Sequence, residues 1–239
     1  IESILSQTFQ DFELILIDDG STDVECLATL DYYSSQDSRI KRIINTPNMG
    51  LIESLNRGIS ASHGEFIARM DSDDISLSER LMTQLDFLEK NPAYALIGTS
   101  AIIINEAGEE IGLKINQTTD SCVKNTLLMT NGFTHATWMF RKNIIVEIGT
   151  YKPDAQAVED YDLLLRLYPY HKIVNLKEPL LFHRINTQGI SWSNNKFQEK
   201  QSLKIRWKYY RQGDYPYWQV ILLFLPILFY LTPSTIKKH

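Results

Sequence analysis

The sequence predicts an α/β fold in which short buried strands alternate with amphipathic helices. Two observations carry this prediction. First, apolar runs of strand length end abruptly in acidic clusters, at Asp18-Asp19 and at residues 71–74. Second, segments with apolar residues at helical spacing lie between these runs, as from Leu51 to Ile59. Strands that lack polar alternation are typical of sheets covered on both faces.

The composition is that of a globular protein with a substantial core. The chain has 239 residues, of which 44% are hydrophobic, enough for one large domain or one domain with an appendage. A net charge of -5, with no basic block outside the ends, argues against nucleic acid as a partner. Cys26 and Cys122 form neither a metal-binding spacing nor a disulfide framework, which fits a reducing cytoplasm.

The first residues predict a helix that has no beginning. Residues 1–7 follow an amphipathic helical pattern from the first position, with no capping residue before them. We therefore expect that a first strand has been lost upstream. The apolar run at residues 12–17 is the next predicted strand, with a tight turn at Gly20 and a helix cap at Ser21 or Thr22.

The remaining elements are predicted by periodicity and by turn residues. The expected strands are residues 40–44, the run that ends before Asp71, and residues 94–105, 110–115, 133–141, 173–176 and 180–185. The expected helices run from Leu51 to before Gly64, after Ser76 or Ser78, over residues 119–129, up to Ile148, after Asp162 and over residues 194–212.

Three carboxylates within four positions predict a metal site at the mouth of a strand. They belong to Asp71, Asp73 and Asp74, and burying such bare charges would cost several kcal/mol each. Clustered carboxylate oxygens suit Mg2+ or Mn2+, with diphosphate oxygens completing the metal shell. Asp74 is interpreted separately, as the start of the turn into the next helix. Strand direction predicts that Asp18-Asp19 and this cluster lie at the same rim.

Four motifs, in this order, resemble those of the family 2 glycosyltransferases with the GT-A fold. They are SILSQTF at 3–9, ELILIDDGSTD at 13–23, DSDD at 71–74 and EDYD at 159–162. The resemblance covers about residues 1 to 190 and implies a Rossmann-like mixed sheet flanked by helices. It also implies inverting transfer of a sugar from a nucleotide-diphosphate donor to an acceptor hydroxyl. We expect a GT-A domain at 1–193 and a helical, hydrophobic C-terminal segment at 194–239.

On the donor side, the resemblance implies roles for four carboxylates. Asp19, beside Asp18, would bind the nucleotide base. Asp71 would face the ribose or the metal shell, and Asp73 would ligate Mn2+ or Mg2+ directly. The alternative for Asp18 and Asp19 is a turn that only caps a helix.

On the acceptor side, the resemblance implies that Asp160 is the catalytic base, with Glu159 beside it. Partial burial at a helix start would raise the pKa of Asp160 toward its working range. The alternative is that both carboxylates only complement a helix dipole. His135 would lie near the acceptor, and His183 and Arg184 near the diphosphate. The alternative for each histidine is a satisfied position in the core.

The C-terminal residues predict contact with a membrane surface. Residues 215–236 carry no charge and approach the roughly 20 residues that cross a bilayer, with lysines at 237–238. We expect a peripheral position at the inner face of the membrane and a saccharide or lipid-linked acceptor. The alternatives are a helix buried in the same core and a dimer contact. Before this run, Lys204, Arg206 and Lys208 would face anionic lipid or solvent.

Three rival functions remain open on the sequence alone. A sugar-phosphate nucleotidyltransferase would use a metal and a related sheet, although Glu159-Asp160 argues against it. A receiver-type regulatory domain also binds Mg2+ through an Asp pair, but such a domain is about half this length. A non-catalytic relative that binds a sugar nucleotide is the third. Family habit favours a transferase in the synthesis of cell-surface polysaccharide or glycolipid.

Overall fold

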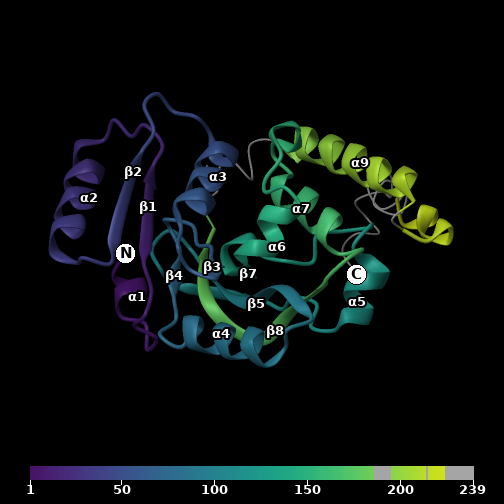
Figure 1. Ribbon diagram of the computed structural model, residues 1–239, viewed down its shortest axis with the longest axis horizontal. Helices are drawn as coiled ribbons and strands as arrows, with labels where there is room; N and C mark the ends of the chain where they lie inside the picture. Colours follow the sequence, from purple (N-terminus) through teal and green to yellow (C-terminus); the bar gives the residue numbers. More distant parts are fainter. Residues whose placement is uncertain (186–194, 214, 224–239) are drawn as a thin grey trace.

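The computed structural model describes residues 1–185, 195–213 and 215–223. It is a mixed α/β fold with a six-stranded sheet at its centre and a two-stranded sheet at one side (Figure 1). The strands are β1 (Leu14–Asp18), β2 (Ile40–Ile44), β3 (Phe66–Ala68), β4 (Ile75–Ser76), β5 (Tyr94–Ile104), β6 (Glu110–Lys114), β7 (Met139–Arg141) and β8 (Lys172–Arg184).

Helices surround both sheets. The α-helices are α1 (Glu2–Leu5), α2 (Val24–Gln36), α3 (Leu51–Ala61), α4 (Arg80–Lys90), α5 (Asp120–Thr126), α6 (Lys142–Glu147), α7 (Glu159–Leu167) and α9 (Asn195–Gln212). Short 3-10 turns are η1 (His135–Thr137), η2 (Pro153–Ala155) and η3 (Tyr217–Gln219). The alternation of strands and helices expected from the sequence is therefore present.

The six-stranded sheet runs in the order β3-β7-β5-β8-β4, and β6 pairs with β5. Only the β5–β8 pair in it is parallel; the other pairs are antiparallel. The two faces of β5 support two cores: Leu96 packs in the cluster that contains α7, and Ile97 packs with Leu81 and Leu88 of α4. Accordingly, α4 covers one face of the sheet while α6 and α7 cover the other (Figure 1).

We expected both Asp clusters at the rim of one sheet, but the strand that carries Asp18 belongs to a separate, smaller sheet. β1 and β2 pair in parallel, and within the described residues they pair with no strand of the larger sheet. Helix α3 packs closely on β1. A Cβ atom added at Gly58 would lie only 2.7 Å from Ile17 Cδ1. Asp23, rather than Ser21 or Thr22, caps α2, since its carboxylate accepts from two backbone N–H groups.

The two strands expected at residues 173–176 and 180–185 form one strand, β8. Two of the three register shifts between β5 and β8 flank Pro179, which pairs with Ser100. Proline lacks a backbone N–H, so a break in the ladder at this point is expected. The strand expected over residues 133–141 is likewise limited to Met139–Arg141, because η1 precedes it.

Helix α9 packs against α7 and completes the core on that side. Tyr209, on α9, donates from its hydroxyl to Asp162 Oδ1 at 2.7 Å, and Asp162 also pairs with Arg166 at 2.8 Å. The Tyr215 hydroxyl donates to the Leu165 carbonyl oxygen at 3.0 Å. Arg206 is 4% exposed, so it faces neither lipid nor solvent, contrary to expectation.

The hydrophobic C-terminal run lies mainly outside the described residues. Within residues 1–185, 195–213 and 215–223, none of the helices is long and apolar enough to span a bilayer. In the described part of the run, Leu223 is buried, whereas Tyr217 and Trp218 are exposed. Membrane attachment and the division into two segments remain predictions.

Candidate active site

Strand β3 delivers an arginine and the first aspartate of the acidic motif to the edge of the sheet. The backbone N–H of Arg69 donates to the Trp138 carbonyl oxygen at 2.9 Å, which continues the pairing of β3 with β7. The Arg69 guanidinium then binds both carboxylate oxygens of Asp71, with Nη1 2.6 Å from Oδ2 and Nη2 in contact with Oδ1. Such bidentate pairing fixes the carboxylate in position.

The acidic motif carries more negative charge than Arg69 neutralises. Burial raises the pKa of Asp71, and the neighbouring Asp74 and Asp73 carboxylates raise it further against the opposing charge of Arg69. A divalent cation would relieve this repulsion, and exposed carboxylate oxygens are the ligands that Mg2+ and Mn2+ accept. No group of three His, Cys, Asp or Glu side chains forms a metal cage within the described part of the chain. Asp71 and Asp73 fit a cation that takes further ligands from phosphate and water.

Asp74 was expected to start the turn into a helix, but the structure gives it a different role. Its side chain is fully buried and accepts from the Arg184 backbone N–H at 2.8 Å, and His183 Nδ1 lies 3.2 Å from Oδ1. β4 begins at the next residue, and α4 begins only at Arg80. Asp74 therefore fastens the acidic loop to the end of β8.

Arg184 reinforces this link from the strand side. Its Nε donates to the Asp73 carbonyl oxygen at 2.9 Å, and its Nη1 donates to the carbonyl oxygens of Asn105 and Glu106 at 2.9 and 3.0 Å. His183 and Arg184 thus lie beside the acidic motif. Whether they contact a diphosphate stays a prediction.

Sequence reasoning missed a buried cation beneath the motif. Arg80 is 0% exposed and donates to the Arg69 carbonyl oxygen at 2.6 Å and to Gln84 Oε1 at 3.0 Å. Burial lowers the pKa of Arg80 to about 10, although the Asp74 carboxylate opposes that shift. A helical arginine reads from sequence as a solvated residue, so only the packing identifies it.

The second acidic cluster begins α7. Asp160 Oδ2 accepts from Asn131 Nδ2 at 2.7 Å, and Oδ1 accepts from the Tyr161 backbone N–H at 2.7 Å. Burial raises the pKa of Asp160. Burial and the Asp160 charge together raise the pKa of Glu159 to about 7. Both carboxyl groups therefore titrate closer to neutrality than ordinary acids.

His135 lies in a dense aromatic contact. Its Nε2 is 2.8 Å from the Tyr151 hydroxyl, and its ring meets Trp138 edge to face with centroids 4.5 Å apart. Burial and the charge of Arg69 hold the pKa of His135 well below its usual range. His135 is therefore neutral at physiological pH, and its expected place near the acceptor stays a prediction.

The charge of Arg69 acts on both acidic clusters. Sequence reasoning did not single out this residue. Its charge lowers the pKa of Glu159 and Asp160 and opposes the rise at Asp71. These groups therefore share one electrostatic environment. The available signal was an arginine placed at the end of an otherwise apolar strand, two residues before Asp71.

Asp18 and Asp19 form a separate cluster on the small sheet. Asp18 is 2% exposed at its side chain and pairs with Arg42 Nη2 at 2.8 Å. The Arg42 hydrogen bond, followed by the Ser21 backbone N–H, lowers the pKa of Asp18. Asp18 therefore bonds to strand β2 and to its own turn, and Asp19 bonds to the loop after β2.

Asp19 organises the loop that follows β2. It accepts from Asn45 Nδ2 at 2.8 Å and from the backbone N–H groups of Met49 and Gly50 at 2.8 and 2.9 Å. Burial alone would raise the pKa of Asp19, but these hydrogen bonds lower it. Gly20 permits this approach, since it has φ of +78° and a Cβ there would lie 2.9 Å from the Asn48 nitrogen.

Comparison with known proteins assigns the class. Residues 1–149 match Glycosyl transferase family 2. The O-antigen biosynthesis glycosyltransferase WbnJ of Escherichia coli is 36% identical over 210 residues, which are 86% of this chain and 81% of that protein. The chain therefore belongs to Glycosyl transferase family 2, and the enzyme class expected from the sequence, a glycosyltransferase, is confirmed.

Two further similarities support the family and the fold. The amylovoran biosynthesis glycosyltransferase AmsE of Erwinia amylovora is 30% identical over 195 residues, which are 80% of this chain and 71% of that protein. The mannosyltransferase PcManGT of Pyrobaculum calidifontis, solved with GDP-Man and Mn2+, is 15% identical with a TM-score of 0.68. The match covers 95% of this chain and 62% of that one. The predicted GT-A-like mixed sheet is confirmed.

Proposed function

We propose that the protein transfers a sugar, with inversion, from a nucleotide-diphosphate donor to a hydroxyl of a saccharide or lipid-linked acceptor. One observation carries this proposal: the Arg69 guanidinium, which pairs with both carboxylate oxygens of Asp71, also lowers by its charge the pKa of Glu159 and Asp160. Sugar transfer needs both parts, because a charged leaving group must be stabilised while a weak nucleophile loses its proton.

The acidic loop would serve the donor. Asp73, with Asp71, would hold Mn2+ or Mg2+, and the bound ion supplies positive charge to the departing diphosphate. Arg69 holds Asp71 in a fixed orientation by its bidentate pair. Asp74, His183 and Arg184 keep the loop on the end of β8. The donor side is therefore preorganised, which avoids reorganisation during the reaction.

Asp160 would serve the acceptor as general base. The acceptor oxygen bonds to the anomeric carbon as the bond from that carbon to the diphosphate breaks, and the hydroxyl proton passes to the Asp160 carboxylate. Burial raises the pKa of Asp160 and so makes it a stronger base than an ordinary aspartate. Asn131 holds one of its oxygens. Attack from the face opposite the leaving group gives inversion.

The relatives support a role in surface polysaccharide synthesis. One is named for O-antigen biosynthesis and another for amylovoran biosynthesis. The solved mannosyltransferase holds GDP-Man and Mn2+, which supports a nucleotide sugar and a divalent cation for this chain. A sugar-phosphate nucleotidyltransferase would instead release pyrophosphate, so analysis of the released product separates the two activities.

The test is metal-dependent donor binding by Asp73→Ala. Calorimetry with UDP and GDP, each with Mn2+, should show affinity falling by more than about tenfold, because a metal ligand is lost. Asp86→Ala removes a half-exposed carboxylate on α4 that pairs with Lys90, so it is the matched control. Unaltered affinity in Asp73→Ala would contradict the assignment of the metal site.

A further inference from the structure

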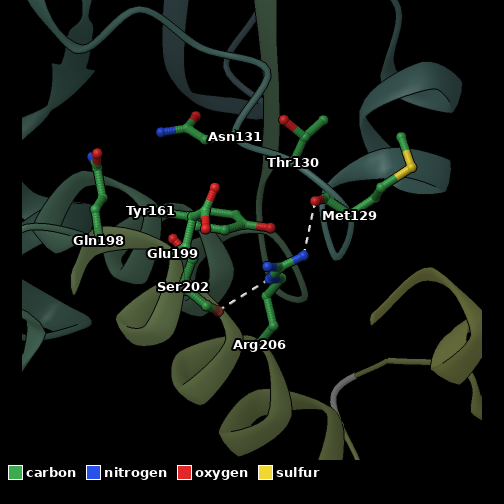
Figure 2. Close-up of a pocket in the computed structure, with 8 residues that line it drawn as sticks. All are labelled: Met129, Thr130, Asn131, Tyr161, Gln198, Glu199, Ser202 and Arg206. Atoms are coloured by element: carbon green, nitrogen blue, oxygen red, sulfur yellow. Dashed lines mark hydrogen bonds between the residues drawn. The ribbon is translucent and has the colours of Figure 1, made fainter. Parts of the chain in front are cut away.

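A cavity lies between α9 and the segment that follows α5. Its volume is about 230 Å³, and its polar lining comes from two parts of the chain that are far apart in sequence (Figure 2). Thr130 and Asn131 form one wall, and Gln198, Glu199, Ser202 and Arg206 of α9 form the other. None of these side chains has a part in donor binding as proposed above.

The lining has the chemistry of a sugar site. Two amides, a carboxylate and two hydroxyls offer both donors and acceptors, and the Tyr161 ring adds an apolar surface. Arg206 is fixed in place, since its Nη1 donates to the Met129 carbonyl oxygen at 2.9 Å and its Nε to the Ser202 carbonyl oxygen at 3.1 Å (Figure 2). The Glu199 charge balances that of Arg206, so the cavity favours a neutral ligand over an anion.

The cavity adjoins the proposed base. Asn131 lines it and also donates to Asp160 Oδ2 at 2.7 Å. Tyr161, the next residue along α7, lines it as well. The cavity and the Asp160 carboxylate therefore share Asn131 as a common neighbour.

We propose that this cavity is the acceptor subsite and that it binds the ring of one neutral sugar residue. Its volume lies below the 300–1,000 Å³ of pockets that enclose drug-sized ligands, so one ring fits better than a longer saccharide. The inference rests on the proposed function, because it takes Asp160 as the base. It assigns acceptor choice to α9, outside residues 1–149 that match the family.

The experiment measures binding of simple glycosides directly. The probes are p-nitrophenyl β-glucoside, β-galactoside, α-mannoside and N-acetyl-β-glucosaminide, detected by saturation-transfer NMR with Mg2+ present. At least one should bind the wild-type protein. Ser202→Trp places an indole in the cavity and should weaken that binding by more than about tenfold. Glu199→Gln removes a charged acceptor and should weaken it by about tenfold.

Lys204→Trp is the matched control, because Lys204 is exposed on α9 and does not line the cavity. Its glycoside binding should equal that of the wild type. If Ser202→Trp does not fold, Glu199→Gln carries the test, since Glu199 is exposed. The inference is overturned if no glycoside binds the wild type, or if the folded cavity variants bind as the wild type does.

Donor binding separates this inference from the proposed function. In calorimetry with Mn2+, the cavity variants that have lost glycoside binding should still bind UDP or GDP. A wild-type protein that binds a glycoside but neither nucleotide would contradict the proposed function while leaving the sugar cavity established. Loss of both affinities in Glu199→Gln would contradict a separate acceptor subsite.

Discussion

Asp18-Asp19 and Glu159-Asp160 are both pairs of adjacent carboxylates, yet their pKa values move in opposite directions. Arg42 and backbone N–H groups lower the pKa of the first pair. Burial raises the pKa of the second pair, that of Glu159 to about 7. The first pair is therefore held ionised and organises loops, whereas in the second pair Glu159 can exchange a proton near neutral pH.

Neighbouring groups, and not residue type, therefore determine the task of each carboxylate. Asp18 has a guanidinium 2.8 Å away, while Asp160 has an amide at 2.7 Å and only the longer-range charges of Arg69 and Lys114. A carboxylate with a close cation resists protonation, and one with a neutral donor in a buried site accepts it more readily. The predictions below alter one member of this comparison at a time.

The largest effect is expected for Asp160→Asn. The substitution keeps the shape of the side chain but removes its basicity, so the transfer rate should fall by about 10²–10⁴-fold. Donor affinity should not change. Release of nucleoside diphosphate measures the rate, and calorimetry measures binding. Asp154→Asn, at an exposed carboxylate of η2, is the control. A rate within about threefold of the wild type would remove Asp160 as the base.

A smaller effect is expected for Arg42→Met, which leaves the buried Asp18 carboxylate without its cation. The free energy of unfolding should fall by about 3–5 kcal/mol at pH 7, as measured in urea. Asp18 has a depressed pKa in the folded state, so its stabilisation is present above the ordinary value of 3.8 and is lost as pH falls through the folded pKa. The loss caused by the substitution should therefore shrink below about pH 4.

Asp31→Asn provides the control for the Arg42 experiment. Asp31 also pairs with Arg42, but its side chain is 72% exposed. Its loss should cost less than about 1 kcal/mol, as is usual for an exposed ion pair. Equal losses in Arg42→Met and Asp31→Asn would show that Asp18 does not depend on this cation.

The smallest effect is expected for Glu159→Gln, and it concerns pH dependence. The pKa of Glu159 rises from 4.5 to about 7 on folding, so the native state binds more protons between these values. The free energy of unfolding should therefore fall as pH rises through this window, and the substitution should reduce that slope. Urea unfolding at pH 5 and pH 8 measures it, with Glu147→Gln as an exposed control. Identical slopes in wild type and Glu159→Gln would contradict the raised pKa.

Local patterns predicted much of this fold. Apolar runs located β1, β2 and β3, and turn residues located the β5–β6 hairpin at Gly108. The acidic motif was expected at the end of a strand, where the structure places it. These features depend on residues within a few positions of one another, which is the range that periodicity and turn chemistry report.

Long-range contacts could not be predicted in the same way. Asn131 reaches Asp160 across 29 positions, and Arg42 reaches Asp18 across 24. Arg80 looks like an ordinary helical arginine until the packing buries it. Asp74 was interpreted as a turn residue because its partners, His183 and Arg184, lie more than a hundred positions away. Pairing of this kind follows from the tertiary fold and leaves no local pattern.

Helix α7 carries Asp160 in its first turn. Further along the same helix, Asp162 binds Tyr209 of α9, and the Leu165 carbonyl oxygen binds the Tyr215 hydroxyl. Because α9 is anchored through Tyr209, its cavity-facing positions at Gln198 and Glu199 are free to vary without moving the base. Relatives could thus diverge in the sugar they extend by exchanging a few side chains on one helix. Under the proposed acceptor subsite, α9 is the place to begin when redirecting this enzyme toward a different acceptor.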